Sequence, residues 1–483
     1  MRRPSADLIV AITVIVMAAW AAPPAAHGQG VGDTLQEAGT PGQGHPTGVA
    51  RQGAEGGGEQ KAGALTLERA LDLALTNNAA IRESLSRRLA SIEGRKAALA
   101  DFFPKLGAAY SYTNLEDQPY TIVGGTKLPV SSDEVFRWQV YAAQPIFTGF
   151  ALSSRYEMAR LGVDLGEAEC DLARMETTRR VKEAYYGCLL AKRALDVSVE
   201  ATDALMAHVK DAERFYDQGM IPFNDLLKSK VALAAAQQSE ERARANLEAA
   251  ISGLNTLLGL EVDRPTEIED ITGAPPLAYD PARLMEAALE NRPEIRSLKI
   301  ALMNAAAAAR LARSSFYPSV SLLGAYERTG DDPRASNNDY GNDHNTSIAL
   351  EAGWQFFEWG KTRAEVKKAE WEKQALEERL RALKDAVRIE VKNAALDARV
   401  AEKNIASARE ALEQARENYR ITNLQYRQQI TSSTEVLDAR TYLSQAQMNY
   451  YGALYGYLSA IARLERASGV TLSGPQPNTN GGS

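Results

Sequence analysis

The chain has 483 residues, of which 24% are charged and 7% aromatic, and its formal net charge is −7. Proline is nearly absent from two segments of about 60 residues or more, which is typical of long packed helices rather than of several compact cores. The acidic balance leaves no basic stripe, so the composition gives no support to a nucleic-acid partner.

The first residues have the features of a secretory signal peptide, which we assign to residues 1–27. Arg2 and Arg3 precede an apolar run from Leu8 to Trp20, and small residues follow it. The alternative, a membrane anchor, needs about 20 apolar residues and is disfavoured. Residues 28–64 and 471–483 are polar and without periodicity, so we expect a disordered leader and a disordered tail.

Export places the chain in an oxidising compartment, yet it has only two cysteines, Cys170 and Cys188. Both fall in one expected helix, about 27 Å apart at 1.5 Å per residue. A disulfide needs Cα atoms within about 7 Å, so these two cannot bridge within the chain. We expect both to be helix-packing residues.

The first half of the chain (residues 65–262) reads as helix, two strands, long helix, tip and helix. The opening helix is expected from Thr66 to about Phe102, where Pro104 ends it. Strict alternation predicts strands at about 105–115 and 134–145, with a loop between them. Further along we expect a helix over about 148–216, a tip at 217–222 and a helix over 224–258.

A proline-containing linker (263–281) leads to a second half (282–470) with the same order. A helix precedes strands at about 319–328 and 345–356, a long helix over about 360–426, a tip at 427–432 and a helix over 433–467. Two motifs recur at nearly one offset, since Pro318 follows Pro104 by 214 residues and Tyr426 follows Tyr216 by 210. We infer that a unit of roughly 210 residues is duplicated.

The four expected strands place apolar and aromatic residues on one face and small or polar residues on the other. That pattern matches the strands of a transmembrane β-barrel. The alternative is a pair of solvent-exposed hairpins packed on one side, but a lone hairpin is marginal in water and we expect no further strands. Four strands cannot enclose a channel, whereas three chains would supply twelve with every edge paired.

The strand-to-helix junctions resemble those of a known family. Residues 144–149 read Gln-Pro-Ile-Phe-Thr-Gly and residues 355–360 read Gln-Phe-Phe-Glu-Trp-Gly. Together with the tip patterns, these are similar to the TolC-like outer membrane efflux protein (outer-membrane factor) family over about residues 65–468. Phe150 and Gln429 stand where the family usually has glycine, and Phe356 where it has proline, so the turns there are expected to differ in detail.

The resemblance implies an α+β membrane protein and a homotrimer. Its twelve-stranded β-barrel would lie among the lipids of the Gram-negative outer membrane, continued by a long α-helical barrel in the periplasm. The implied role is the exit duct of a tripartite efflux pump or a type I secretion system. The implied partners are a periplasmic adaptor protein and an inner-membrane transporter of the RND or ABC type.

Two carboxylates just beyond the second tip, Glu435 and Asp438, are three residues apart and share one helix face. In a trimer they would form rings of acidic side chains, which favour cations. The resemblance matches them to an acidic gate ring, and matches Asp225 and Tyr426 to a gate latch that Thr431 would weaken. The alternative is a solvated acidic helix face with no gating role.

The tips are candidate docking surfaces for the adaptor, although helix–turn–helix chemistry alone also explains the glycine and proline there. The residues concerned are Gly219, Met220, Ile221, Ile430 and Thr431. A membrane aromatic belt is expected from Phe136, Trp138 and Trp354.

No histidine, cysteine or carboxylate cluster has metal-ligand spacing, and no glycine-rich phosphate loop follows a strand. We therefore expect neither an enzyme nor a cofactor. Besides a passive channel, the sequence leaves open a periplasmic coiled-coil adaptor or spacer without a pore. The transported substrate is not readable from the sequence.

Overall fold

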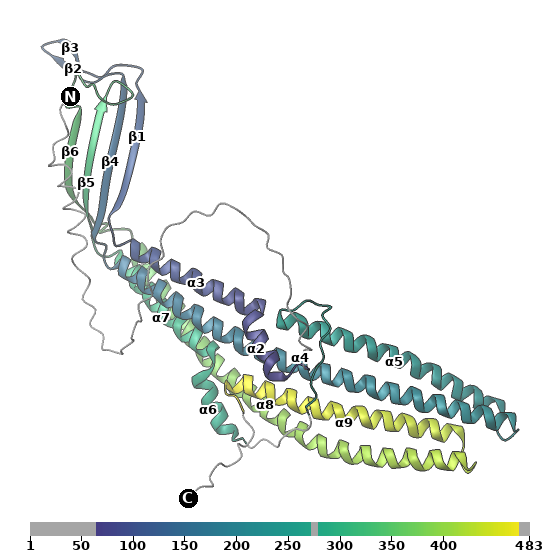
Figure 1. The fold of residues 1–483 in the computed structure, drawn as a ribbon. Helices are drawn as coiled ribbons and strands as arrows, with labels where there is room; N and C mark the ends of the chain where they lie inside the picture. The colour runs from purple at the N-terminus through teal and green to yellow at the C-terminus, as the bar shows by residue number, and fades with distance from the viewer. Residues whose placement is uncertain (1–63, 272–278, 473–483) are drawn as a thin grey trace, which may run out of the picture. The chain divides into compact units, whose positions relative to one another are not determined.

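A computed structural model describes residues 64–271 and 279–472, all of which fall in one unit. The expected signal peptide, the leader up to residue 63, the middle of the linker and the tail from residue 473 lie outside the described residues. The described part of the chain consists of long helices and two β-sheets (Figure 1).

The first half begins with two short helices, has four strands and ends with a long helical hairpin. Its elements are α2 (Leu67–Asn77), α3 (Ala79–Ala100), β1 (Lys105–Asn114), β2 (Tyr120–Val123), β3 (Thr126–Pro129), β4 (Glu134–Phe147), α4 (Ala151–Asp217) and α5 (Phe223–Leu258).

The second half has helices in the same order as the first half, and it has two strands. Its elements are α6 (Pro281–Asn291), α7 (Pro293–Ser314), β5 (Ser319–Gly330), β6 (His344–Gly353), α8 (Lys361–Arg427) and α9 (Ser433–Ser468).

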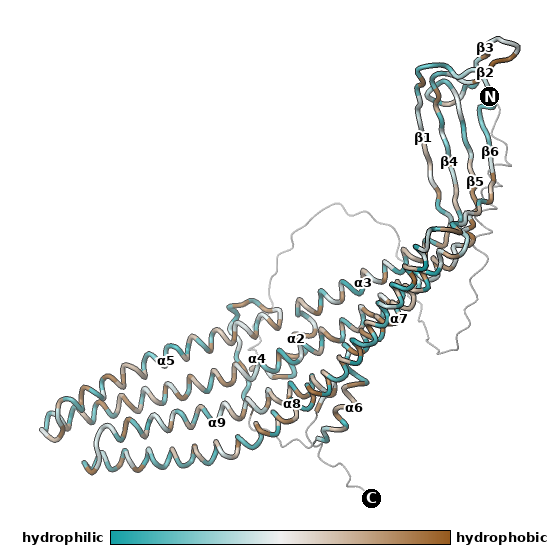
Figure 2. The backbone as a smooth tube through the Cα atoms, turned by 180° about the vertical axis from the view of Figure 1, so that it is seen from behind, coloured by the Kyte–Doolittle hydropathy of each residue, from teal (hydrophilic) through white to brown (hydrophobic). Residues whose placement is uncertain are grey.

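The helices of the two halves correspond in order and in length. α2 and α6 both have 11 residues, α3 and α7 both have 22, α4 and α8 both have 67, and α5 and α9 both have 36. In Figure 1 α4 runs beside α5 and α8 beside α9, and both pairs are in extensive contact. Hydrophobic and hydrophilic stretches alternate along each of these helices (Figure 2), as expected where one face packs on a neighbour.

The single opening helix expected over residues 66–102 is wrong, because the chain breaks at Asn78. This residue has an extended ψ of 131°. Its side-chain oxygen accepts from the Ala80 amide and its side-chain amide donates to the Leu257 carbonyl. Asn78 thus ends α2 and caps α3, which is the role that short polar side chains favour. In the second half Arg292 makes the equivalent break, since the following Pro293 disfavours helical geometry before it.

Four strands form one antiparallel sheet in the order β1-β4-β5-β6. The residues expected on the apolar face lie opposite one another: Tyr110 pairs with Trp138, Val140 with Tyr326, and Leu322 with Leu350. Because side chains alternate along a strand, this register collects them on a single face. β1 and β6 are the edges of the sheet, and neither pairs with a further strand among the described residues.

The expectation of no further strands is also wrong. β2 and β3 form a separate two-stranded hairpin in the segment expected to be a loop. Gly124 and Gly125 connect them with φ of +60° and +86°. Two consecutive positive φ angles define the turn whose twist suits a two-residue hairpin, and glycine adopts them without steric cost.

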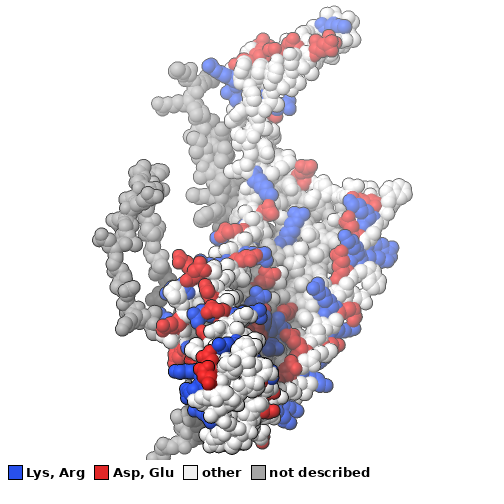
Figure 3. Space-filling view, turned by 90° about the vertical axis from the view of Figure 1, so that its right-hand side faces the viewer, with Lys and Arg blue, Asp and Glu red and all other residues white. Residues whose placement is uncertain are grey.

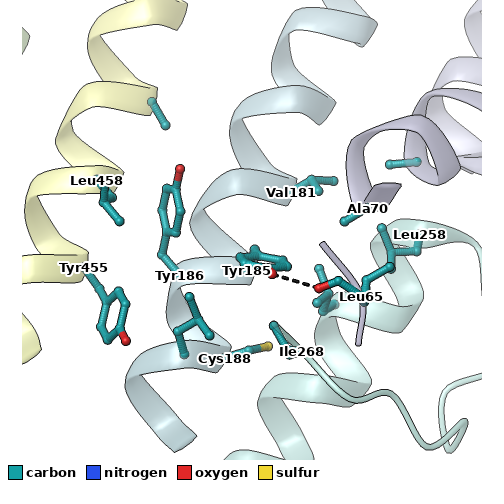
Figure 4. Close-up of a cluster of buried hydrophobic side chains, with 14 of the residues drawn as sticks. Leu65, Ala70, Val181, Tyr185, Tyr186, Cys188, Leu258, Ile268, Tyr455 and Leu458 are labelled. Carbon is teal, nitrogen blue, oxygen red and sulfur yellow. Dashed lines mark hydrogen bonds between the residues drawn. The ribbon is translucent and has the colours of Figure 1, made fainter. Parts of the chain in front are cut away.

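A hydrophobic core lies where α2, α4, α5 and α9 meet (Figure 4). Tyr185 on α4 is 1% exposed, and its hydroxyl lies 2.8 Å from the Leu65 carbonyl and 2.7 Å from that of Glu269. Burial raises the pKa of Cys188, which belongs to this core, to about 12. Cys170 and Cys188 are both free and buried, as expected of packing residues.

A charged network joins the two halves near the ends of α7 and α9. Arg292 is 3% exposed, and its guanidinium reaches Glu294 at 2.8 Å and Glu390 at 2.6 Å. Arg466 reaches the same two carboxylates at 2.9 and 2.7 Å. Glu176 on α4 also pairs with Arg466, so the network links α4, α7, α8 and α9. We refer to these five residues as the inter-half network.

Among the described residues, no helix combines the length and the apolar character needed to cross a membrane.

Candidate functional site

The turns between the paired long helices have the same backbone geometry. We call residues 218–222 the first tip turn and residues 428–432 the second. At the first, the Met220 amide donates to the Phe215 carbonyl and the Gly219 amide to that of Tyr216. At the second, the amides of Ile430 and Gln429 make the two corresponding bonds. This pair of bonds is the Schellman motif, which requires a left-handed residue just past the helix.

Gln429 takes the left-handed position of the second tip turn, with φ of +62°, where Gly219 has φ of +70°. The expected difference in turn geometry is therefore wrong: the glutamine adopts the conformation that the glycine adopts. A residue with a Cβ atom carries a cost of roughly 1 kcal/mol in that conformation.

Replacing Gln429 with glycine should relieve that strain. We expect Gln429→Gly to raise the free energy of unfolding by about 0.5 kcal/mol, less than the full strain, because glycine also adds entropy to the unfolded chain. The matched change Gly219→Ala should lower it by about 1 kcal/mol, because the strain of alanine at positive φ outweighs the entropy that alanine removes from the unfolded chain. Guanidinium titration of the detergent-solubilised protein measures both, and a stabilising Gly219→Ala would contradict the argument.

The five candidate docking residues lie at the two tip turns. Met220 is 53% exposed and Ile430 is 68% exposed, while Ile221 and Thr431 are half-buried. The Gln429 side chain contacts the sulfur of Met220, so the two tip turns touch. The tips thus present apolar side chains to the outside at the end where both helical hairpins finish.

Glu435 and Asp438 lie in the first two turns of α9 and both are exposed. The hydroxyl of Ser432 accepts from the Glu435 amide at 3.5 Å, which caps the helix. Neither carboxylate forms an ion pair with a described residue. Two unneutralised negative charges therefore share one exposed face of α9 just beyond the tip.

The structure of a single chain does not join Asp225 to Tyr426. Asp225 pairs with Lys228 on its own helix at 3.3 Å. Tyr426 is 2% exposed and packs on Phe215 and His208, with ring centroids 5.6 and 4.6 Å away. Burial raises the pKa of Tyr426.

Sequence reasoning missed the residues that do join the helices at this level. His208 on α4 is 4% exposed, and its Nε2 lies 2.8 Å from the Ser433 hydroxyl. That hydroxyl lies 2.9 Å from the hydroxyl of Ser229 on α5. A signal existed, because His208 falls at helical spacing among buried positions of α4, but its partner is 225 residues away in the sequence.

Aromatic residues gather toward both ends of the four-stranded sheet. Trp138 and Phe136 lie toward the start of β4, where their rings contact Tyr326 and Tyr112 at centroid distances of 6.1 and 4.7 Å. Trp354 follows the last residue of β6, is 59% exposed, and donates to the Phe316 carbonyl at 3.2 Å. On the face seen in Figure 3, the middle of the strand region is largely free of charge, whereas acidic and basic residues are interspersed over the helices.

Both strand-to-helix junctions place two consecutive residues in left-handed geometry. Gly149 and Phe150 have φ of +59° and +71°, and Trp359 and Gly360 have φ of +50° and +82°. The presence of Phe150 therefore does not change the turn. Its ring packs edge-on against Phe147 and Tyr317, at centroid distances of 5.5 and 5.8 Å.

Among the described residues there is no group of three or more His, Cys, Asp or Glu side chains placed to hold a metal ion. The chain nevertheless matches a known family. The model of the family described as outer membrane efflux protein matches it twice, over residues 70–260 and 284–470. The chain belongs to the outer membrane efflux protein family. The resemblance inferred from the junctions and tips is thereby confirmed, and with it the outer-membrane location and a role in transport.

Two curated proteins are similar in sequence to this outer membrane efflux protein. The alkaline protease secretion protein AprF of Pseudomonas aeruginosa is 26% identical over 420 residues, which cover 82% of this chain and 83% of AprF. Protein CyaE of Bordetella pertussis is 26% identical over 272 residues, which cover 55% of this chain and 56% of CyaE.

Solved outer-membrane channels share the fold. The CmeC channel of Campylobacter jejuni superposes with a TM-score of 0.73 at 16% identity, covering 85% of this chain and 87% of CmeC. The channel OprN superposes with a TM-score of 0.70 at 21% identity, covering 83% and 89%. The outer membrane protein VceC of Vibrio cholerae gives 0.70 at 15% identity, covering 84% and 97%. At these identities the likeness establishes the fold of the efflux protein and leaves its cargo open.

Proposed function

We propose that this outer membrane efflux protein assembles as a homotrimer in which twelve strands close a β-barrel and the long helices form a periplasmic tunnel. The observation that carries the proposal is the four-stranded sheet with two unpaired edges, β1 and β6. An unpaired edge costs hydrogen bonds in a membrane, and a ring of three sheets removes all edges. The equal helix lengths and the double family match support descent of the two halves from one duplicated unit.

The spacing of the aromatic residues supports a membrane position for the sheet. Trp138 pairs with Arg328 and Gly353 pairs with Ser319, nine residues away along β5 (328 − 319). At about 3.3 Å per residue, Trp138 and Trp354 are roughly 30 Å apart along the strands. Strands tilted by about 40° would project that length onto about 23 Å, close to the apolar band of outer-membrane barrels.

The exit duct would serve a tripartite assembly with a periplasmic adaptor protein and an inner-membrane transporter. The exposed side chains of Met220 and Ile430 are proposed to dock the adaptor, and Asp225 to act in the gate latch with a group of a neighbouring chain. AprF is an alkaline protease secretion protein, which favours protein export through an ABC-type transporter over small-molecule efflux through an RND-type one. A deletion strain distinguishes them: loss of an exported protein from the medium supports secretion, and drug or metal sensitivity supports efflux.

The acidic pair Glu435 and Asp438 is proposed to line the tunnel's narrow end. We expect detergent-purified protein in a planar bilayer to conduct with cation preference, and Glu435→Gln/Asp438→Asn to lower that preference by about threefold or more, because rings of carboxylates attract cations. The control Glu410→Gln/Glu413→Gln removes two charges at the same spacing on α8 and should leave selectivity unchanged.

The two outcomes of that measurement separate the duct from the gate. A folded, membrane-extracted protein that never conducts would favour a pore-free periplasmic spacer. If both double variants conduct with unchanged selectivity, the protein is a duct but Glu435 and Asp438 do not form an acidic ring in it.

A further inference from the structure

A buried polar cluster at the base of the tips touches all four tip helices. It consists of His208 on α4, Ser229 on α5, Tyr426 on α8 and Ser433 at the start of α9, and each is no more than 4% exposed. Ser433 is the centre, because its hydroxyl lies 2.8 Å from His208 Nε2 and 2.9 Å from the Ser229 hydroxyl. Tyr426 covers the imidazole from the α8 side. We call these four residues the tip cluster.

Counting protons fixes the direction of the hydrogen bonds. The Ser229 hydroxyl donates to the Asp225 carbonyl at 3.0 Å, so it can only accept from Ser433. Ser433 then has no proton left for His208, and the His208 Nε2–H donates to Ser433. This arrangement gives the donors of His208, Ser433 and Ser229 one acceptor each and leaves the lone pair of His208 Nδ1 without a partner. The Tyr426 hydroxyl also has no hydrogen-bond partner among the described residues. The opposite tautomer would bury an unpaired N–H, which costs more.

A second proton on His208 would find no acceptor. Nδ1 has no hydrogen-bond partner among the described residues. On α4, the nearest carboxylate, Asp211, pairs with Arg214 and with Arg427 of α8, both at 3.4 Å. On α5, Asp225 pairs with Lys228.

The other two helices also offer no neutralising charge. α8 contributes the neutral Tyr426 next to the imidazole, and α9 contributes the neutral Ser433. Burial lowers the pKa of His208 to about 4, and the charge of Asp211 opposes this only in part.

We propose that His208 is a positioning residue for the tip: in its neutral form it holds the start of α9 against α4 and α5, and its protonation releases α9. The proposal rests on the proposed function, since release of α9 matters where the tips close a duct. It differs from the acidic ring, which acts on ions, because the tip cluster is buried and acts on helix position.

The size of the effect follows from linkage. The pKa of the His208 imidazole is near 6.5 when the side chain is exposed and about 4 when it is buried. As the pH falls from 6.5 to 4, the exposed state gains a proton before the buried state does, so the equilibrium moves toward the exposed state. Full protonation shifts the balance toward the exposed state by about 300-fold, which is ten raised to the difference of 2.5. The neutral cluster is intact above about pH 6.5, and most of the shift falls between about pH 6.5 and pH 4.

The test is single-channel conductance in planar bilayers between pH 7.5 and pH 4.5, with the full mature protein carrying an affinity tag free of histidine. Wild type should open more often as the pH falls. His208→Gln keeps an amide donor for Ser433 but cannot titrate, so its opening should change much less over the same range. Ser433→Ala removes the acceptor and should raise opening already at pH 7.5, with a weaker pH dependence.

Matched controls distinguish the effect of protonating His208 in the tip cluster from the effects of other titrating groups. His344→Gln removes an exposed histidine at the start of β6 and should keep the wild-type pH profile. Hydrogen exchange of the amides in residues 434–439, compared between wild type and His208→Gln at one acidic pH, should show faster exchange in wild type. Identical pH profiles and identical exchange in wild type and His208→Gln would overturn the proposal. If the protein never conducts at any pH but the difference in hydrogen exchange remains, the duct is rejected and the role of His208 in the tip cluster is supported.

Discussion

Arg292→Met is expected to lower the free energy of unfolding by about 3 kcal/mol, because removing one partner of a buried ion pair leaves charge without compensation. Arg292 is 3% exposed and binds both Glu294 and Glu390, while Arg466 alone would remain for these two carboxylates. Leaving Glu294 without Arg292 should cost more stability than leaving Glu390, because the Glu294 side chain is 19% exposed and that of Glu390 is 43% exposed. Guanidinium titration of the solubilised protein measures the change.

The control for this substitution is Arg283→Met in the preceding helix. Arg283 is 88% exposed and pairs with Asp280 at 3.8 Å, so its loss should cost less than about 0.5 kcal/mol. The double variant Arg292→Met/Glu294→Met removes both charges and should be more stable than Arg292→Met alone. If Arg292→Met and Arg283→Met lose equal stability, the buried ion pairs of Arg292 with Glu294 and Glu390 do not stabilise the second half.

The same network predicts how stability depends on pH. Burial alone would raise the pKa of Glu294, but the hydrogen bonds and charges of Arg292 and Arg466 outweigh it and hold the pKa below its usual value. A carboxylate whose pKa is lower in the folded protein stabilises the fold at pH values above its unfolded pKa of about 4.5. That stabilisation is lost as the pH falls through the pKa of the folded state. Wild type should therefore lose stability below about pH 4.5 more steeply than Arg292→Met/Glu294→Met.

The strands and tips were predictable because their signals are local. Alternation along β1, β4, β5 and β6 marks the apolar face, and the observed register places those residues together. The boundaries of α5 and α9 follow from the turn residues before them. Such patterns depend on the periodicity of one segment, so they survive without knowledge of the rest of the fold.

The structural features that the sequence does not predict depend on contacts between distant segments or on a single side chain. The break at Asn78 looks like helix in a window of sequence, and it is stabilised by a bond to Leu257 on another helix. The bond between His208 and Ser433 joins residues of different halves. The hairpin of β2 and β3 has a local signal, because the Gly124-Gly125 pair is typical of a two-residue turn between strands.

Gly149→Ala is expected to disrupt the first strand-to-helix junction and to cost about 3 kcal/mol or more, because strain and overlap add at one position. Gly149 has φ of +59°, and a Cβ there would overlap the Ser314 carbonyl and lie 2.9 Å from the Cβ of Tyr317. Ser314 is the last residue of α7, and β5 begins five residues later at Ser319, so a shift of this backbone would also displace the start of β5. We therefore expect a smaller yield of folded protein in the outer-membrane fraction as well as a lower unfolding midpoint.

Gly360→Ala at the second junction isolates the strain. Gly360 has φ of +82°, and a Cβ there would meet no atom within 4 Å. Its substitution should cost only about 1 kcal/mol, the price of left-handed geometry for a residue with a side chain. Phe150 and Trp359 already accept that geometry at these junctions, which indicates that strain alone is tolerable. Equal losses from Gly149→Ala and Gly360→Ala would mean that the close approach of α7 to the first junction does not matter, and that backbone conformation alone sets the requirement for glycine.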